Sequence, residues 1–175
     1  MQHPINAIRV GAAKEGGSNI SSTASNFAIN IQNTAGLPSN GGGEGDHRNA
    51  MRHTLWQGII TNEMGESHAN RIGNAHENNL NVDLSQRTFN NMADADKVVD
   101  LLNNQIGREI GKQNKGASNQ IMAEKMATEF YKNGLWTASE NKEGGISIQR
   151  TRLTEEQYNS AIEEIRRKNE NGMNR

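Results

Sequence analysis

Apolar residues recur every three to four positions along much of this chain, a spacing that predicts amphipathic helices. The clearest stripe is formed by Val98, Val99, Leu102, Ile106 and Ile110. Asp46 is a typical N-cap residue, and Thr154 with Gln157 three positions later predicts a capping box. The pattern as a whole predicts five helices, over residues 46–64, 66–79, 93–113, 118–133 and 154–168.

Two segments depart from the helical pattern. Residues 135–138 and 146–150 flank a loop that contains glycines, which predicts a β-hairpin. Residues 1–45 are rich in Gly, Ser and Asn, which predicts a flexible leader with at most one short strand, over 27–31. The predicted fold is therefore mainly α, a helical bundle with one small β-hairpin, in a domain over residues 46–175 that follows the leader.

Composition narrows the classes of function. The chain contains no cysteine, which excludes disulfides, thiolate metal sites and a cysteine nucleophile. Its formal net charge is −1. Tight binding to a nucleic-acid backbone requires a basic face, so this charge argues mildly against a nucleic-acid binder but leaves room for a nuclease with a local basic cleft. No apolar run approaches the roughly 18 residues of a membrane span, so we expect no stable membrane insertion.

Four of the five histidines lie within residues 46–77. Successive helical residues rotate by about 100°, which places His53 at the edge of the buried arc of its helix and His76 near the middle of the next one. His47 falls on the opposite face and is discounted. Buried polar groups are costly unless they are paired or coordinate a ligand, so we expect a site here. The first helix adds three polar residues to its buried side, Arg48, Asn49 and Arg52.

The predicted helix over 93–113 offers a third set of polar groups. Asp100, Asn103 and Gly107 line one flank of its apolar stripe, and Gly107 would let another helix or a ligand approach closely. Glu77 lies at the margin of the preceding helix. If the helices form a bundle, these groups converge. The candidate catalytic residues are His53, His76, Glu77 and Asp100, and the candidate substrate-binding residues are Arg48, Asn49, Arg52, Asn103, Asn104 and Arg108.

The candidate catalytic residues also form a candidate metal site. Imidazole and carboxylate groups suit a divalent metal such as zinc, manganese or iron, and a metal-bound water would attack an ester or phosphoester at neutral pH. The arginines would hold an anionic group. The order of ligands is loosely similar to that of the helical HD phosphohydrolases, H…HD…D, with Glu77 where that family has Asp. The candidate metal ligands are His53, His76, Glu77 and Asp100.

A metal-free site and purely structural roles are the alternatives. His53 or His76 would act as a general base and Glu77 as a general acid, with the arginines stabilising developing negative charge. Structurally, His76 would be a satisfied core histidine, and Arg48 and Arg52 would be partners in ion pairs between helices. No H-E-x-x-H, P-loop, G-x-S-x-G or deaminase motif occurs, so the corresponding enzyme classes have no support.

Three short elements carry a resemblance to a known group. They are R-H-T-L-W at residues 52–56, A-H-E at 75–77 and D-L-L-N-N-Q-I-G-R at 100–108. The region over about 46–113 resembles an uncharacterised helical group of toxin-like C-terminal domains from bacterial polymorphic toxins, including Rhs-type, contact-dependent inhibition and type VI secretion proteins. The resemblance implies a secreted antibacterial effector, a larger delivery protein or secretion system, and a cognate immunity protein. It implies no particular reaction.

These observations lead to one main functional hypothesis and two alternatives. The main hypothesis is a hydrolase toxin acting on a phosphoester or a lipid-linked envelope substrate, because the arginines suit an anionic substrate. The periplasm of the target cell is then slightly favoured as its place of action. A nuclease toxin acting on RNA or DNA in the cytoplasm is the first alternative. A non-enzymatic toxin that binds a host factor is the second, and it should tolerate substitution of His76 unless that residue lies in its interface.

Overall fold

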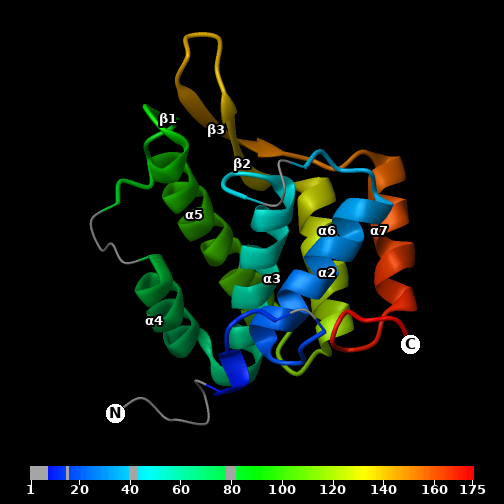
Figure 1. Ribbon diagram of the computed structural model, residues 1–175. Coiled ribbons are helices and arrows are strands. Elements are labelled where there is room, and N and C mark those ends of the chain that lie inside the picture. Colours follow the sequence, from blue (N-terminus) through cyan, green and yellow to red (C-terminus); the bar gives the residue numbers. More distant parts are fainter. Residues whose placement is uncertain (1–7, 15, 40–42, 78–81) are drawn as a thin grey trace.

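The protein is a mainly helical bundle with a small antiparallel sheet, as the sequence predicted (Figure 1). A computed structural model describes residues 8–14, 16–39, 43–77 and 82–175, except for the side chains of His76 and Glu77. Its helices are α2 (Ile20–Thr34), α3 (His47–Met64), α4 (Glu66–Glu77), α5 (Met92–Gln113), α6 (Asn119–Lys132) and α7 (Glu155–Arg167). Its strands are β1 (Thr88–Phe89), β2 (Leu135–Glu140) and β3 (Ile146–Thr151).

The helices begin where side chains cap them. The carboxylate of Asp46 accepts a hydrogen bond of 2.8 Å from the backbone N–H of Asn49 at the start of α3. At the start of α7, the side chain of Thr154 accepts from the N–H of Gln157, whose side chain accepts from the N–H of Thr154. Both caps satisfy N–H groups that have no partner inside the helix. The predicted capping residues are therefore confirmed.

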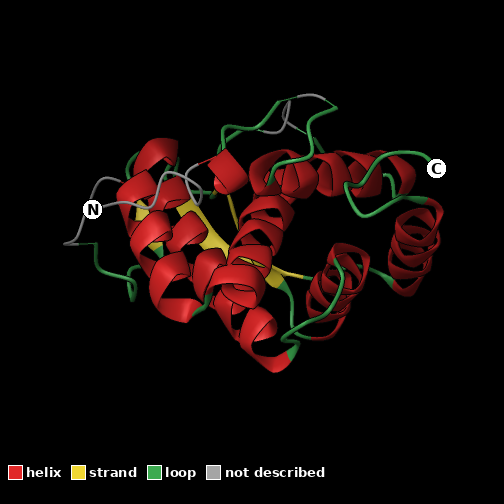
Figure 2. Cartoon of the chain, turned by 90° about the horizontal axis from the view of Figure 1, so that it is seen from below, coloured by secondary structure: helices red, strands yellow, loops and turns green. Residues whose placement is uncertain are grey.

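The sheet contains one strand more than the predicted hairpin. β2 and β3 form that hairpin, and β1 pairs with the other edge of β3, which gives the order β1-β3-β2. The sheet lies at one end of the bundle, at the top in Figure 1 and behind the helices in Figure 2. A small apolar cluster joins it to α5, and it includes Phe89, Val98, Val99, Ile146 and Ile148. Strand β1 has only two residues, too few to show the alternation of apolar and polar positions from which a strand is predicted.

The predicted flexible leader is wrong for residues 20–34, which form helix α2. Asn19 caps this helix by accepting a hydrogen bond of 2.8 Å from the N–H of Ser22. The alternating run over 27–31 is helical, because it belongs to a longer stripe with helical spacing. The stripe consists of Ile20, Ala24, Phe27, Ala28 and Ile31, all completely buried in the core that α2 shares with α3.

Helix α3 is the centre of the bundle and packs against α2, α4, α5 and α6. It is buried on nearly all sides. The face of α3 that we expected to point outward, which carries His47, also carries Thr54 and Thr61, and these two residues are only 1% and 4% exposed. That face packs against α5 at two glycines. A Cβ atom at Gly107 would overlap the carbonyl oxygen of Thr54, and one at Gly111 would lie 2.5 Å from the carbonyl oxygen of Gly58. The prediction that Gly107 permits a close approach is therefore confirmed.

Within the described residues, no helix is long and apolar enough to cross a lipid bilayer.

Candidate functional site

A buried contact between a histidine of α3 and an aspartate of α5 forms the centre of the site. Nε2 of His53 lies 3.2 Å from Oδ2 of Asp100, and the two side chains are 3% and 6% exposed. Nδ1 of His53 lies 3.3 Å from Oδ1 of Asn104, one turn further along α5. Such groups are buried at a cost that only mutual pairing offsets. The predicted convergence of His53 with Asp100 is confirmed, and it depends on the close contact of α3 with α5 at Gly107.

Asn49 and Arg52 complete this arrangement, which we call the His53 network (His53, Asp100, Asn104, Asn49 and Arg52). The amide of Asn49 donates to Oδ1 of Asp100 at 2.8 Å and to Oδ1 of Asp96 at 3.0 Å. Arg52 donates in turn to the side-chain oxygen of Asn49, and its guanidinium lies 3.0 Å from Nε2 of His53. Oδ1 of Asp100 therefore has a donor in Asn49, and Oδ2 has one when Nε2 of His53 is protonated, which orients the carboxylate toward the imidazole.

The surroundings of His53 suit a group that gains and releases a proton. When Nδ1 carries the proton and donates it to Asn104, Nε2 holds a lone pair that can accept from Arg52. When Nε2 is protonated as well, it can donate to the carboxylate of Asp100. Nε2 thus has a partner with and without its proton, and the negative charge of Asp100 favours the imidazolium.

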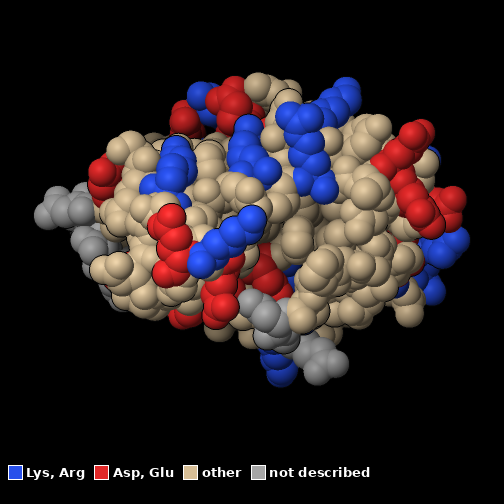
Figure 3. All heavy atoms as spheres, turned by 90° about the horizontal axis from the view of Figure 1, so that it is seen from above, with Lys and Arg blue, Asp and Glu red and all other residues tan. Residues whose placement is uncertain are grey.

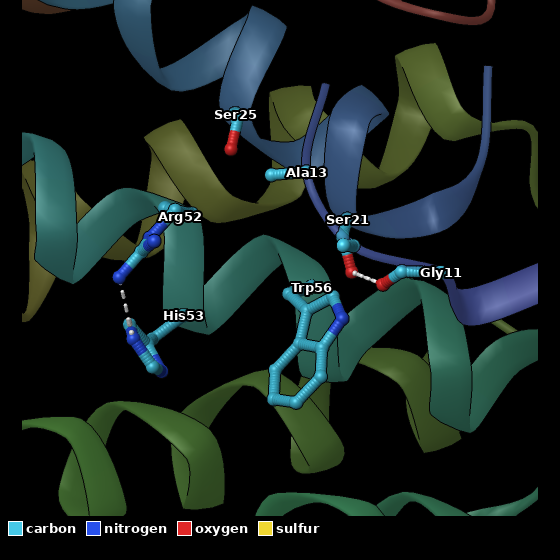
Figure 4. Close-up of a pocket in the computed structure, with 8 residues that line it drawn as sticks. Gly11, Ala13, Ser21, Ser25, Arg52, His53 and Trp56 are labelled. Carbon is cyan, nitrogen blue, oxygen red and sulfur yellow. Dashed lines mark hydrogen bonds between the residues drawn. The ribbon is translucent and has the colours of Figure 1, made fainter. Parts of the chain in front are cut away.

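Two adjoining pockets border the network. The larger has a volume of ≈ 310 Å³ and lies between His53 and Trp56 of α3, the start of α2, and residues 11–13. The smaller has a volume of ≈ 160 Å³ and is lined by Ser25, Ile29, Arg48, Asn49 and Arg52. Ser25 and Arg52 line both pockets. Figure 4 shows the side chains of Arg52 and His53 next to each other, with Ser25, Ser21 and Ala13 across the pocket from them.

The N-terminal wall of the larger pocket is held by side chains of α2 and of its cap. The hydroxyl of Ser21 donates to the carbonyl oxygen of Gly11 at 2.8 Å, and the amide of Asn19 donates to that of Ala12 at 3.0 Å. Gly11 has a φ of +59°, a conformation that disfavours other residues. These pocket residues lie in the region predicted to be a flexible leader, so they were not among the candidate site residues. The helical spacing of the apolar residues of α2 is the signal in the sequence that this region is ordered.

Two predicted substrate-binding residues have other contacts. The amide of Asn103 donates to the carbonyl oxygen of Trp136 at 2.9 Å and accepts from its N–H at 3.0 Å, which attaches β2 to α5. Asn103 is completely buried and both ends of its amide are engaged, so in this structure it supports the sheet. Arg108 donates to the side chain of Gln57 at 3.2 Å. Burial lowers the pKa of the Arg108 guanidinium, and Glu66 on α4 opposes this effect.

A second polar spot lies where α3, α4 and α5 meet. The side-chain nitrogens of Gln57 and Asn104 are buried and have no hydrogen-bond partner within the described part of the chain. Both lie near Gly73 of α4, where an added Cβ atom would be 2.9 Å and 3.4 Å from them. Gln57 did not feature in the sequence analysis. It occupies a position on α3 that only the packing of three helices reveals as part of this polar region.

The predicted metal site is only partly described. The side chains of His76 and Glu77 lie outside the described residues, whereas those of His53 and Asp100 are paired as above. Of the residues that helical phase places on the buried side of α4, Ala69 is buried as expected, but Ala75 is exposed. Gly73 is buried as well. Among the described residues, no group of three or more His, Asp or Glu side chains could hold a metal ion. A site for zinc, manganese or iron that includes His76 and Glu77 stays a prediction.

Comparison with protein families places this site in a family. A family model described as a domain of unknown function, DUF6973, matches residues 2–134. The chain belongs to this family. The DUF6973 match covers the whole His53 network and both pockets, and it crosses the predicted boundary at residue 45. No curated protein and no solved structure matches the chain. The DUF6973 description assigns no reaction, so the chemistry must be argued from the site itself.

His47, which we had discounted, provides a test by pH. Its ring stacks on Phe130 with centroids 5.9 Å apart. Burial lowers its pKa below the ordinary value of 6.5, although Asp46 and a backbone hydrogen bond with Pro38 raise it. The folded state therefore favours neutral His47, and the unfolded chain binds a proton more readily below pH 6.5. Stability contributed by this residue is present above pH 6.5 and is lost as the pH falls toward the lowered pKa.

We expect the variant His47→Phe to lose less stability than the wild type between pH 7.5 and pH 5. The phenyl ring keeps the stacking partner and has no proton to gain. Chemical denaturation at both pH values measures the change in the free energy of unfolding. An equal loss in both proteins would contradict the assignment of this pH sensitivity to His47.

Proposed function

We propose that this chain is a phosphoester hydrolase whose acid–base group is His53 and whose anion-binding group is Arg52. The observation that carries the proposal is the buried pair of His53 and Asp100, 3.2 Å apart, at the wall of a pocket that Arg52 also lines. A carboxylate-oriented imidazole next to a guanidinium combines a proton acceptor with a group that binds phosphate oxygens. These are the two functions that hydrolysis of a phosphoester requires.

Four members of the His53 network each have one role in the proposed reaction. Arg52 binds the phosphate in the smaller pocket, which moves its guanidinium away from Nε2 of His53. A water molecule attacks phosphorus, and its proton passes to Nε2. The bond from phosphorus to the ester oxygen breaks, its electron pair stays on that oxygen, and solvent protonates the leaving group. Asp100 stabilises the imidazolium until its proton returns to solvent, and Asn49 holds Asp100 in place.

The charge distribution favours a small phosphoester over a nucleic acid as substrate. On the face in Figure 3, basic and acidic side chains are interspersed. The net charge of the chain is −1. A protein that binds along a nucleic-acid backbone gains most of its affinity from a basic face. A substrate that needs only one or two arginines fits this protein better.

We further propose that the hydrolase acts as an antibacterial toxin. The support is the resemblance to polymorphic toxin domains, together with the place of its motifs in the fold. Arg52, His53 and Trp56 come from the first motif, and Asp100 and Asn104 come from the last, so the two motifs meet at the His53 network. In this proposal a larger protein or secretion system delivers the domain into a target bacterium, and a cognate immunity protein protects the producing cell.

Hydrolysis can be tested on the purified chain. The substrates are p-nitrophenyl phosphate and bis-p-nitrophenyl phosphate, each with EDTA and with added zinc, manganese or iron. We expect release of nitrophenol by the wild type and by His68→Gln, a matched histidine variant on α4 that lines neither pocket, but not by His53→Gln. The EDTA and metal arms test whether a metal contributes. Equal turnover by both variants, or no turnover by the wild type, would overturn the proposal.

Growth of a bacterial host tests the toxin proposal. We expect expression with export to the periplasm to stop growth, and His53→Gln to restore it while His68→Gln does not. Toxicity confined to the cytoplasm and lost with His53→Gln would favour the nuclease alternative. Toxicity that persists in His53→Gln would contradict an enzymatic mechanism at this site and favour a binding module.

A further inference from the structure

The smaller pocket has the composition of an anion site. Arg48 and Arg52 lie one turn apart on α3, and both line it together with the polar groups of Asn49 and Ser25. Guanidinium groups match phosphate oxygens in geometry as well as in charge. Its volume of ≈ 160 Å³ suits a group of phosphate size and leaves little room for a large organic group. The carboxylates of Asp96 and Asp100 do not line it and are instead bonded to Asn49.

The larger pocket has a different composition. Among the described residues, small residues of the N-terminal segment, Trp56 and two serines line it, and the ionisable side chains in this lining are Arg52 and His53. The hydroxyl of Ser21 is already bonded to Gly11. At ≈ 310 Å³ the pocket is at the lower end of the range of about 300–1,000 Å³ that ligand pockets usually have. It therefore suits a compact apolar group.

The two pockets adjoin at Arg52 and Ser25, which line both. His53 lines the larger pocket beside Arg52 (Figure 4). We infer that the substrate is a compact organophosphate, with its phosphate in the smaller pocket and its apolar group in the larger one. The ester bond then lies at the junction, next to Nε2 of His53. As a statement about the substrate, this inference rests on the proposed function.

Binding of stable phosphonates tests the inference without turnover. Isothermal titration calorimetry with inorganic phosphate, phenylphosphonate and hexylphosphonate measures the contribution of each pocket. We expect at least one phosphonate to bind about tenfold more tightly than phosphate, because an apolar group adds roughly 1.4 kcal/mol or more when it is buried. Tighter binding of the phenyl compound would indicate a planar group such as a nucleobase, and tighter binding of the hexyl compound would indicate a lipid-like chain.

Two variants assign the pockets. Ala13→Leu fills the larger pocket, so we expect it to reduce the affinity for the preferred phosphonate to that for inorganic phosphate. Arg48→Gln removes one guanidinium from the smaller pocket, so we expect all three ligands to bind about tenfold more weakly. Arg166→Gln, an exposed arginine paired with Glu124 on α6, is the matched control and should change nothing. Equal affinities for phosphate and both phosphonates in the wild type would overturn the inference.

The two proposals fail in different ways. If phosphonates bind as expected but no phosphoester is hydrolysed, the binding site stands and the hydrolase fails. If His53→Gln abolishes hydrolysis while Ala13→Leu and Arg48→Gln leave the KM of p-nitrophenyl phosphate unchanged, the hydrolase stands and the pocket assignment is overturned. Circular dichroism of each variant verifies that the helices are intact.

Discussion

His53→Gln is expected to lower kcat for phosphoester hydrolysis by about 10²–10⁴-fold, the range that loss of a general acid–base group usually causes. Glutamine fills most of the space of the imidazole and can still donate a hydrogen bond, but it cannot accept and release a proton near neutral pH. The loss should fall mainly on kcat, because the arginines that hold the phosphate remain. Steady-state kinetics at several pH values measure both parameters.

Asp100→Asn provides the companion measurement. It keeps the shape of the side chain and removes the charge that stabilises the His53 imidazolium, so we expect an intermediate loss of kcat and an altered pH profile. His68→Gln should retain the wild-type profile. If folded His53→Gln protein, verified by circular dichroism, kept the wild-type kcat, the histidine would be a structural residue and the proposed mechanism would be wrong.

Gly107→Ala is expected to reduce the free energy of unfolding by about 3 kcal/mol, the upper part of the usual range for overpacking. Alanine normally stabilises the interior of a helix by up to about 1 kcal/mol relative to glycine. Here the added methyl group would overlap the backbone carbonyl of Thr54, which cannot move without displacing α3. Urea denaturation followed by circular dichroism measures the change.

Gly58→Ala is the matched control on the facing helix. Its added methyl group would lie 3.0 Å from the end of the Met122 side chain, which can move aside at small cost, and 3.3 Å from the carbonyl oxygen of Gly107, a tight contact but no overlap. We therefore expect it to be much less destabilising than Gly107→Ala. Equal effects of the two substitutions would show that the contact of α5 with α3 is not limited by the backbone at Gly107.

His53 and Asp100 show what the rotation per residue of a helix can predict and what it cannot. Each residue was assigned to the inner side of its helix from the rotation per residue alone, and the two side chains do meet. The same method assigned Asn103 to the substrate, whereas its amide bonds to Trp136 of β2. Phase indicates the direction of a side chain, but it does not indicate which element lies in that direction.

Helix α2 differs, because its sequence does contain the pattern of a helix, but the composition of the surrounding segment favoured a flexible leader. Its stripe from Ile20 to Ile31 has helical spacing, and Asn19 is a good cap. Because the surrounding residues are rich in Gly, Ser and Asn, the segment was interpreted as a leader. The error affected the candidate site, since α2 lines both pockets and the segment before it lines the larger one.

The sequence by itself determined the mainly α class, most helix boundaries and the inward position of the His53 and Asp100 pair, because caps and apolar periodicity are local properties of the chain. Only the tertiary structure decided that α3 is buried on nearly all sides, that Gln57 lies in a polar spot, and that Arg52 separates two pockets. Those features depend on which helices touch and how closely. Such contacts join residues far apart in the chain, so no local pattern records them.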